Sequence, residues 1–393
     1  MIGISKLYCG TVEASDPLRY SRKAKHLPSH LLQFSEDKKP VVVWNITRAC
    51  NLRCVHCYAH ATDEIAGGEL GTEEGKALLN DLAGFGVPVV LFSGGEPLVR
   101  KDLLELAAYA VGKGMRTVIS SNGTLITHEL ARKLKDVGLS YVGISLDGLE
   151  EINDRFRGMK GAFRQAMEGI RHCQEAGIKV GLRFTISKMN KDEVPSLFDL
   201  MEERTIPRIC FYHLVYAGRG STMIHGDLSH RETREVVDLI INRTRQLHDR
   251  GFKAEVLTVD NHADGPYLYL RLLQEGSPRA AEVLKLLEMN EGNSSGRGIG
   301  CVSWDGRVHA DQFWRHYSFG NVRERPFSEI WTDFSNPLMA KLKNKKKYVK
   351  GRCALCRWLS ICGGNFRVRA EAVGDLWNPD PACYLTDEEV GLS

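Results

Sequence analysis

The sequence has no long uninterrupted hydrophobic run and no strong excess of charge of either sign. No apolar stretch approaches the roughly 18 residues that a membrane-spanning helix needs, so we expect no membrane partner. The net charge is only +4 over 393 residues, and basic and aromatic residues are not interleaved in a stripe, so we expect no nucleic-acid partner. The N-terminal segment lacks the layout of a signal peptide, and the sequence therefore predicts a cytoplasmic protein.

Cysteine, by contrast, is abundant. The chain has 11 cysteines, and because disulfides rarely persist in the cytosol, metal ligation is the default interpretation. Most of them fall in two groups, which are Cys50, Cys54 and Cys57, and Cys353, Cys356, Cys362 and Cys383. Cys173 and Cys210 lie in a helical and a strand pattern, which predicts small buried side chains.

Strand and helix patterns alternate from residue 40 onward. Buried strands are predicted at 41–47, 87–97, 116–123, 141–148, 179–187 and 208–215, with helix-length segments between them. Six strands in this order form a parallel sheet, so the fold class is α/β, either an open sheet or a partial (β/α)6 TIM barrel. Residues 216–300 are less regular, with helices predicted at about 230–249 and 267–289. A short hairpin is expected around Asp305 and Gly306.

The unusual residues follow the strands, where the chemistry of such folds gathers. The first cysteine group comes after the first strand, and the segments GGEP (94–97), SNG (121–123) and SLDG (145–148) end the next three. Three thiolates at CxxxCxxC spacing complete neither a structural zinc site nor an ordinary iron–sulfur site, because both use four. They can hold three irons of a [4Fe–4S] cube and leave the fourth open for a substrate or cofactor. A zinc site or a purely structural cluster is the alternative.

Together these segments resemble the radical S-adenosylmethionine (SAM) enzymes, whose signature is CxxxCxxC with an aromatic residue next to the third cysteine. The resemblance covers about 45–215 and implies that the open iron chelates SAM, that GGEP receives the SAM ammonium group, and that SNG and SLDG contact the rest of the molecule. The implied cofactor-binding residues are Tyr58, Gly94, Gly95, Glu96, Pro97, Ser121, Asn122, Ser145 and Asp147. The resemblance also implies a 5′-deoxyadenosyl radical that attacks C–H bonds, so the barrel must exclude water.

The second cysteine group supplies four thiolates, a closed set for a fully ligated [4Fe–4S] cluster. It resembles the SPASM extension of many radical SAM enzymes, which carries two auxiliary clusters in its full form. Phe366 and Asp311 stand where further cysteines are expected, so we predict one auxiliary cluster. Cys301 belongs to neither group and is a remnant, a buried thiol or an unexpected ligand. For the second cysteine group, a four-cysteine zinc site is the alternative. The resulting domains are an N-terminal extension (1–40), a radical SAM partial barrel (41–250), a linker with helices (251–300) and a SPASM-like domain (301–393).

Stretches at the N-terminus, around the first cysteine group and at the C-terminus resemble radical SAM enzymes that remodel sirohaem-derived tetrapyrroles in haem biosynthesis. Some members remove two acetate arms from 12,18-didecarboxysirohaem to give Fe-coproporphyrin III, and others remove propionates on the way to a dioxo-haem; the opening segment favours the acetate-removing members. The resemblance implies an iron tetrapyrrole substrate and a low-potential electron donor, either ferredoxin or flavodoxin. SPASM-type peptide maturation and a non-enzymatic iron–sulfur electron carrier are the alternatives.

A tetrapyrrole with several carboxylates needs an apolar slot rimmed by cations. Arg183 and His213 are the first candidates, because their strand ends face the expected cavity, and we count them with the first cysteine group as catalytic. The further candidates are Arg19, Arg22, Lys23, Lys25, His26, Arg219, Arg297, Arg307, His309, Arg315 and His316, and an axial iron ligand is sought among His26, His30, His213 and His225. The lysine-rich run 341–350 is expected to be a solvated face on which an acidic electron donor could dock.

Overall fold

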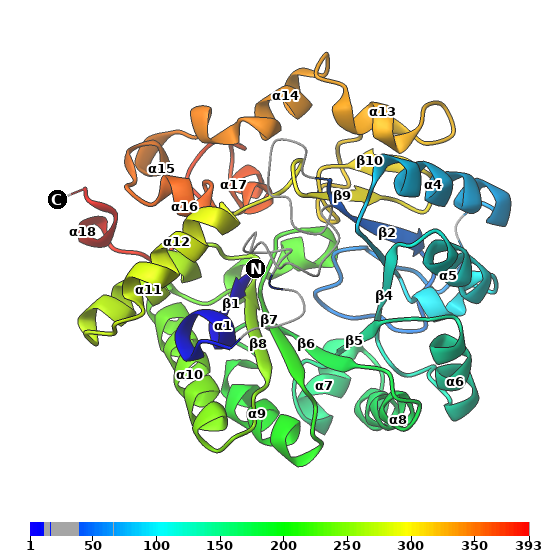
Figure 1. The fold of residues 1–393 in the computed structure, drawn as a ribbon, viewed down its shortest axis with the longest axis horizontal. Helices are drawn as coiled ribbons and strands as arrows, with labels where there is room; N and C mark the ends of the chain where they lie inside the picture. The colour runs from blue at the N-terminus through cyan, green and yellow to red at the C-terminus, as the bar shows by residue number, and fades with distance from the viewer. Residues whose placement is uncertain (12–15, 17–38, 66, 393) are drawn as a thin grey trace.

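The computed structural model describes residues 1–11, 16, 39–65 and 67–392. Within these ranges one open sheet has the strand order β1-β8-β7-β6-β5-β4-β3-β2-β9-β10-β11. All neighbours from β8 through β2 to β9 pair in parallel. The helices that connect the parallel strands form a ring around the outside of the curved sheet (Figure 1).

The strands are β1 (Ile2–Gly3), β2 (Val41–Thr47), β3 (Val89–Gly94), β4 (Arg116–Ser121), β5 (Tyr141–Ser145), β6 (Val180–Ile186), β7 (Arg208–His213), β8 (Glu255–Val259), β9 (Ile299–Val302), β10 (Arg307–His309) and β11 (Gly320–Asn321). The α-helices up to the end of the barrel are α1 (Ile4–Cys9), α4 (Thr72–Phe85), α5 (Leu103–Gly112), α6 (His128–Asp136), α7 (Glu150–Arg157), α8 (Ala162–Glu175), α9 (Val194–Glu203), α10 (His230–Asp249), α11 (Asp264–Gln274) and α12 (Ala280–Asn290). Those that follow are α13 (Phe327–Thr332), α14 (Pro337–Lys343), α15 (Gly351–Leu355), α16 (Leu359–Cys362), α17 (Arg367–Ala372) and α18 (Asp387–Val390). Short 3-10 helices lie at Pro97–Val99, Lys191–Glu193, Gly218–Gly226 and Lys345–Lys347.

The local sequence explains where the barrel elements begin and what they bury. Strand β2 reads VVVWNIT, and its residues are almost all buried, as expected for a parallel strand covered on both faces. Helix α10 begins at a capping box in which Ser229 Oγ accepts from Glu232 N and the Glu232 carboxylate accepts from Ser229 N. Its apolar stripe joins those of the other outer helices in one hydrophobic core with the strands.

The six predicted strands are all present as β2 to β7, which confirms the (β/α)6 partial barrel. The sheet is longer than predicted, because β8 continues it beside β7 and β9 continues it beside β2. The range 251–300, predicted as a linker with helices, therefore also holds a barrel strand, and five residues (EVLTV) are too few to show a clear pattern. The single helix predicted at 267–289 is two helices, α11 and α12, with a turn at Gly276, whose φ is +62°. The hairpin at Asp305 and Gly306 is present as β9 and β10.

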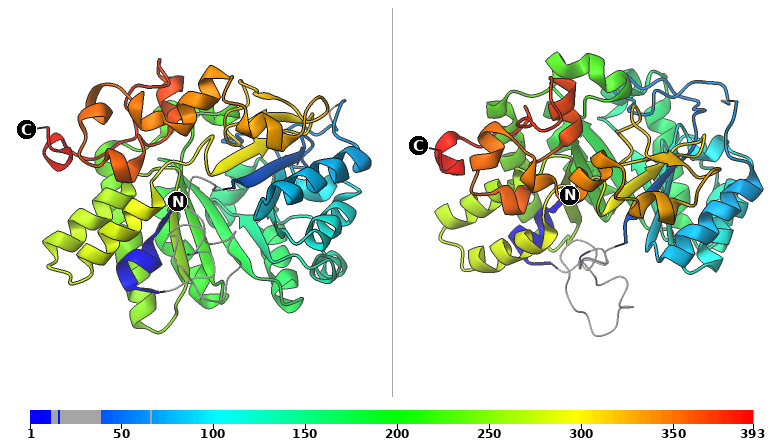
Figure 2. Two further views of the ribbon diagram at one scale, coloured as in Figure 1. Left: turned by 45° about the horizontal axis from the view of Figure 1, so that its top comes forward. Right: turned by 90° about the horizontal axis from the view of Figure 1, so that it is seen from above.

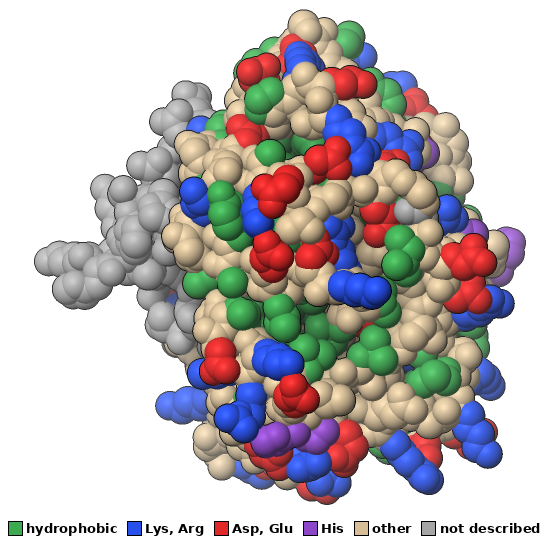
Figure 3. Space-filling view, turned by 90° about the vertical axis from the view of Figure 1, so that its right-hand side faces the viewer, with side chains coloured by type: hydrophobic (Ala, Val, Ile, Leu, Met, Phe, Trp, Pro, Cys, Tyr) green, Lys and Arg blue, Asp and Glu red, His purple; other side chains and the backbone are tan. Residues whose placement is uncertain are grey.

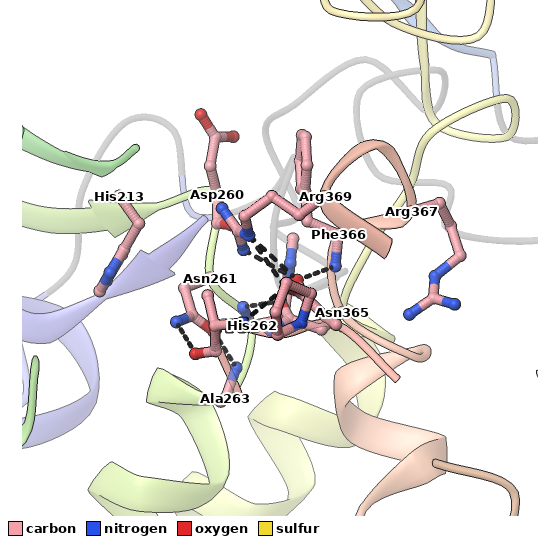
Figure 4. A network of polar contacts seen from close by, with 12 residues as sticks. His213, Asp260, Asn261, His262, Ala263, Asn365, Phe366, Arg367 and Arg369 are labelled. Carbon is pink, nitrogen blue, oxygen red and sulfur yellow. Dashed lines mark hydrogen bonds and ion pairs between the residues drawn. The ribbon is translucent and has the colours of Figure 1, made fainter. Parts of the chain in front are cut away.

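The C-terminal helices α13 to α18 lie together over one end of the barrel (Figure 2). Arg369 of α17 is fully buried and pairs with Asp380 at 2.9 Å. Its guanidinium also donates to the backbone oxygens of Leu214 and Asp260, which directly follow β7 and β8. One buried arginine thus joins the C-terminal segment to the carboxyl ends of two barrel strands (Figure 4).

The lysine-rich run 341–350 is not the continuous solvated face that the sequence predicts. Lys345 is buried, and its ammonium group donates to Asn293 Oδ1 at 2.5 Å. Lys343, the last residue of α14, lies over the Trp331 ring at 4.3 Å. Lys341, Lys347 and Lys350 remain exposed. On the face that carries α4, α5 and α6, acidic and basic side chains are interspersed (Figure 3).

Candidate active site

The loop that carries the first cysteine group follows β2, and backbone and side-chain donors hold its backbone in place. Val55 N donates to Phe156 O at 2.9 Å, and Cys50 N donates to Thr62 O at 2.7 Å. Arg219 Nε donates to Cys54 O at 2.7 Å, and a second nitrogen of Arg219 donates to Ala61 O. Arg219 was a candidate for the cationic rim of a substrate slot, but its guanidinium is used to fix this loop.

The three thiols of the loop, Cys50, Cys54 and Cys57, line one cavity at the carboxyl ends of the strands. Burial raises the pKa of Cys50 to about 12 and also raises the pKa of Cys54. Leu52 N donates to Cys50 Sγ at 3.3 Å, and an Arg157 nitrogen lies 3.7 Å from Cys54 Sγ. The cation and the N–H donor beside these thiols stabilise thiolates, as iron ligation requires, so this donor set fits a cluster.

The GGEP segment lies against this loop, and its glycines are required by close packing. A Cβ atom at Gly94 would collide with Thr47 O, and one at Gly95 would collide with Ala49 O. Gly94 also has a φ of +127°. Gly94 and Gly95 line the cavity, so the strand end can approach a ligand with its backbone.

Glu96 of the same segment is fully buried and braces neighbouring strand ends. Its carboxylate accepts from Leu98 N at 3.1 Å, Ser121 Oγ at 2.9 Å and Asn122 N at 2.7 Å. Burial raises its pKa to about 7. The two carboxylate oxygens of Glu96 already accept from three protein donors. Contact of this side chain with a SAM ammonium group stays a prediction. Pro97, which begins the 3-10 helix at 97–99, does not border the cavity.

The SNG and SLDG segments place polar side chains around the cysteine loop. Asn122 Nδ2 donates to Asn51 Oδ1 at 2.8 Å and lies 3.9 Å from Cys50 Sγ. Ser121, Asn122 and Ser145 line the cavity. Asp147 is fully buried, pairs with Arg157 at 2.5 Å and lies 3.3 Å from His56 Nε2. Asp147 is therefore linked to the cysteine loop through its contacts with the side chains of Arg157 and His56.

His56 and Arg157 belong to this site, although sequence reasoning missed both. His56 lies directly before Cys57, lines the cavity and packs against the Phe156 ring at 5.4 Å. Burial lowers the pKa of His56 to about 4, so the ring is neutral. The position of His56 next to the third cysteine could have identified it from the sequence. The aromatic residue expected beside that cysteine was instead taken to be Tyr58. Tyr58 also lines the cavity and donates to Asn45 Oδ1 at 3.1 Å.

Arg183 of β6 and His213 of β7 also line the cavity, as predicted from their strand ends. A Cβ atom at Gly143 would collide with Arg183 Nε, so this glycine lets the guanidinium lie across β5. Arg183 Nε is buried without a hydrogen-bond partner. The guanidinium carbon of Arg183 lies 6.0 Å from the centre of the Tyr212 ring. His213 Nε2 lies 3.0 Å from Asp264 Oδ2.

Most of the other predicted rim residues have protein partners. Arg315 donates to Ala59 O and lies over the Trp304 ring, and His309 is buried between Ser303 and the Tyr317 backbone oxygen. The remaining pairs are Arg297 with Glu291, Arg307 with Asp305 and His316 with Glu371. His225 does not border the cavity. The candidates that lie outside the described residues are Arg19, Arg22, Lys23, Lys25, His26 and His30.

The second cysteine group converges in the C-terminal domain. Burial raises the pKa of Cys362, and Cys383, Cys353 and Cys356 are each close enough to raise it further by charge repulsion. An Arg352 nitrogen lies 3.5 Å from Cys383 Sγ, and Trp358 N lies 3.4 Å from Cys356 Sγ. Four half-buried thiols that lie close together, with N–H donors beside two of them, fit a fully ligated cluster. Cys301 is not among them; it is fully buried on β9 and accepts from Asn45 Nδ2 at 3.5 Å.

Two family models match the chain. Residues 44–201 match the radical SAM superfamily, and residues 295–358 match SPASM, an iron–sulfur cluster-binding domain. The chain belongs to the radical SAM superfamily and carries a SPASM extension, so it is an enzyme that uses SAM, a SAM-binding [4Fe–4S] cluster and an auxiliary cluster.

Within this superfamily, several similar proteins are named for the synthesis of haem or a related tetrapyrrole. The chain is 72% identical to Fe-coproporphyrin III synthase of Methanosarcina barkeri, over 100% of this chain and 99% of the relative. It is 43% identical to pre-heme d1 synthase of Dinoroseobacter shibae, over 90% and 88% of the two chains. An AdoMet-dependent heme synthase of M. barkeri is 32% identical over 87% and 95%.

Solved structures agree on the fold. SuiB of Streptococcus suis bound to its precursor peptide SuiA superposes with a TM-score of 0.70, at 19% identity over 91% of this chain and 79% of that one. The anSMEcpe structure with bound AdoMet has a TM-score of 0.69, at 18% identity over 90% and 96%. In the described residues, no helix has the length and apolarity needed to cross a membrane.

Proposed function

We propose that this enzyme removes the two acetate arms of 12,18-didecarboxysirohaem to give Fe-coproporphyrin III. The observation that carries the proposal is the 72% identity to an Fe-coproporphyrin III synthase along the full length of both chains. The cavity supports it, because a carboxylate-bearing substrate needs a cation, and Arg183 faces the cavity without an ion-pair partner among the described residues.

We assign the SAM-binding cluster to Cys50, Cys54 and Cys57, and the auxiliary cluster to Cys353, Cys356, Cys362 and Cys383. The shared cavity of the first group, the close approach of the four thiols of the second group, and the N–H donors beside both groups support this assignment. The SAM contacts are assigned to the cavity-lining Tyr58, Gly94, Gly95, Ser121, Asn122 and Ser145, with Glu96, Pro97 and Asp147 as supports of their segments. When bound, SAM supplies the radical that removes one hydrogen atom from the substrate periphery.

The protein side chains bind the substrate and exclude water. The cavity walls include Val43, Leu91 and Phe313, which suit the flat apolar face of a tetrapyrrole. In this arrangement Arg183 binds a substrate carboxylate. His213 is a candidate axial ligand of the substrate iron, because metal-binding histidines commonly hold a carboxylate with the other ring nitrogen, as His213 holds Asp264.

A low-potential electron donor, ferredoxin or flavodoxin, completes the system. The exposed Lys341 and Lys347 offer positive charge beside the auxiliary cysteines in sequence, whereas Lys350 pairs with Asp375 at 2.7 Å. Such exposed charge suits an acidic partner by electrostatic steering. The buried Lys345 does not contribute to it.

The test is anaerobic incubation of the reduced enzyme with SAM and 12,18-didecarboxysirohaem, followed by mass analysis of the tetrapyrrole. Loss of two acetate arms supports the proposal. Loss of propionates would instead indicate the activity of a pre-heme d1 synthase, the 43% identical relative. Unchanged tetrapyrrole together with SAM cleavage would refute both, and absence of SAM cleavage would favour an electron carrier.

A further inference from the structure

Asp260 has a backbone conformation that non-glycine residues rarely adopt. It directly follows β8 and has a φ of +67°, in the left-handed region. Contacts on both sides hold it there, because Arg369 donates to Asp260 O, Asn261 Nδ2 donates to Ala382 O at 2.9 Å, and His262 N donates to Asn365 Oδ1 at 2.7 Å. Such strain persists where surrounding structure fixes it, and it concentrates at functional sites.

This conformation turns the carboxyl group of Asp260 away from the C-terminal network that holds its backbone (Figure 4). The residue is 8% exposed, borders the cavity, and its Oδ2 atom has no hydrogen-bond partner. An unpartnered buried carboxyl oxygen is unfavourable and calls for an explanation. The other acids at this site are engaged, since Glu96 holds three donors and Asp147 holds Arg157.

The surroundings of Asp260 favour its protonated form. Burial raises its pKa to about 7, so a large fraction carries a proton at neutral pH. The charged groups that face it are the Met1 amine, Arg369 and His213, which lower the pKa, and Asp311, which raises it. A protonated carboxyl group is also compatible with a substrate that carries several carboxylates, whereas a second negative charge would repel it.

From this geometry, and resting on the proposed acetate removal, we propose that Asp260 is the acid that protonates the departing acetate arm. After a hydrogen atom has been removed, the ring holds one unpaired electron. The bond between the ring carbon and the methylene carbon of the arm then breaks, and one of its electrons completes a ring double bond. The methylene carbon keeps the other electron, and it becomes the methyl group of acetate by gaining one electron from a reduced iron–sulfur donor and one proton from Asp260. Solvent then reprotonates Asp260 between the two rounds.

The first test uses Asp260→Asn, which keeps the size of the side chain but has no acidic proton. We expect the yield of acetate per 5′-deoxyadenosine to fall about tenfold or more, as for the loss of a general acid. Glu255→Gln is the matched control, because Glu255 is also a buried acid of the β8 segment but pairs with Arg208 and Lys179 outside the cavity lining. An equal yield per 5′-deoxyadenosine in Asp260→Asn and wild type would overturn the proposal.

Two further measurements do not depend on that yield. In D2O, each acetate released by the wild type should contain one solvent deuteron in its methyl group, and acetate without deuterium would overturn the proposal. In an infrared pH titration of the protein without substrate, the wild-type minus Asp260→Asn difference should show a protonated carboxyl band that disappears with a midpoint near pH 7. Absence of that band would also overturn the proposal. A wild type that leaves the tetrapyrrole unchanged refutes the proposed function itself, whereas deuterium-free acetate refutes only the role of Asp260.

Discussion

Replacing Arg183 with glutamine should weaken binding of the tetrapyrrole by about 10- to 100-fold. The guanidinium of Arg183 borders the cavity, and no carboxylate of the described residues lies within ion-pair distance of it. A hydrogen bond between charged groups contributes about 1.5–3 kcal/mol. Because about 1.4 kcal/mol corresponds to a factor of ten in the dissociation constant, the expected loss is one to two orders of magnitude.

Arg208 on the neighbouring strand provides the matched control. Its guanidinium lies 3.2 Å from Glu255 Oε2 and does not border the cavity. Glu255 also lies 3.5 Å from Lys179, so Arg208→Gln leaves this buried acid with a cation. We expect Arg208→Gln to bind the tetrapyrrole with nearly the wild-type dissociation constant. The assay is an anaerobic titration of the tetrapyrrole absorption band, with thermal unfolding as a check that both variants fold.

A substrate analogue with esterified carboxylates separates an ion pair from a packing effect. If Arg183 binds a carboxylate, esterification should weaken binding to the wild type and have little further effect on Arg183→Gln, because the two changes remove the same interaction. The reasoning is refuted if Arg183→Gln binds the free acid as tightly as the wild type does. It is also refuted if esterification weakens both proteins by the same factor.

Three further predictions concern the C-terminal domain. Arg369→Ala leaves Asp380 buried and unpaired, so the free energy of unfolding should fall by about 3–5 kcal/mol in a denaturant titration, and a change below about 1 kcal/mol would contradict this. Cys383→Ser should lower the iron content from about eight to about four atoms per chain, whereas Cys301→Ser should leave it at about eight; equal losses would contradict the assignment of the auxiliary ligands. Lys347→Glu should slow reduction by an acidic electron donor, and the difference in rate between variant and wild type should shrink as salt is added. A reduction rate that changes neither with the substitution nor with salt would exclude docking there.

The features that could be predicted from the sequence are those encoded locally. The six strands β2 to β7 are rich in β-branched and apolar residues, and their connecting helices are long enough to show a pattern. The cysteine spacing and the GGEP segment are also local, so the cavity they border could be located before the structure was known. Strand β8 was missed because it has only five residues, and the parallel pairing of β9 with β2 was missed because β2 lies far away in the sequence.

The missing site residues are those whose role depends on contacts across the chain. Arg157 lies about a hundred residues from Cys54, and only the packing of α7 against the cysteine loop brings the two together. Asp260 was missed because β8 was missed, so nothing marked it as a residue at a strand end. Arg219 shows the opposite error, since a cation near a strand end was assigned to the substrate although it binds the backbone of the cysteine loop.

The two positions that lack the expected further cysteines have acquired other roles in the wall of the cavity. Asp311 bonds Ser295 and accepts from Phe313 N at 2.8 Å, which fixes the backbone of Phe313. Phe366 packs edge-on against the Phe313 ring at 5.5 Å, and Phe313 packs against Tyr58 at 5.1 Å. Side chains that fill this region with apolar contacts leave Cys301 as a buried thiol without a second cysteine beside it among the described residues. The same substitutions that argue for a single auxiliary cluster therefore also build the aromatic side of the substrate cavity, and this links the chemistry of the C-terminal domain to the shape of the space in which the tetrapyrrole would bind.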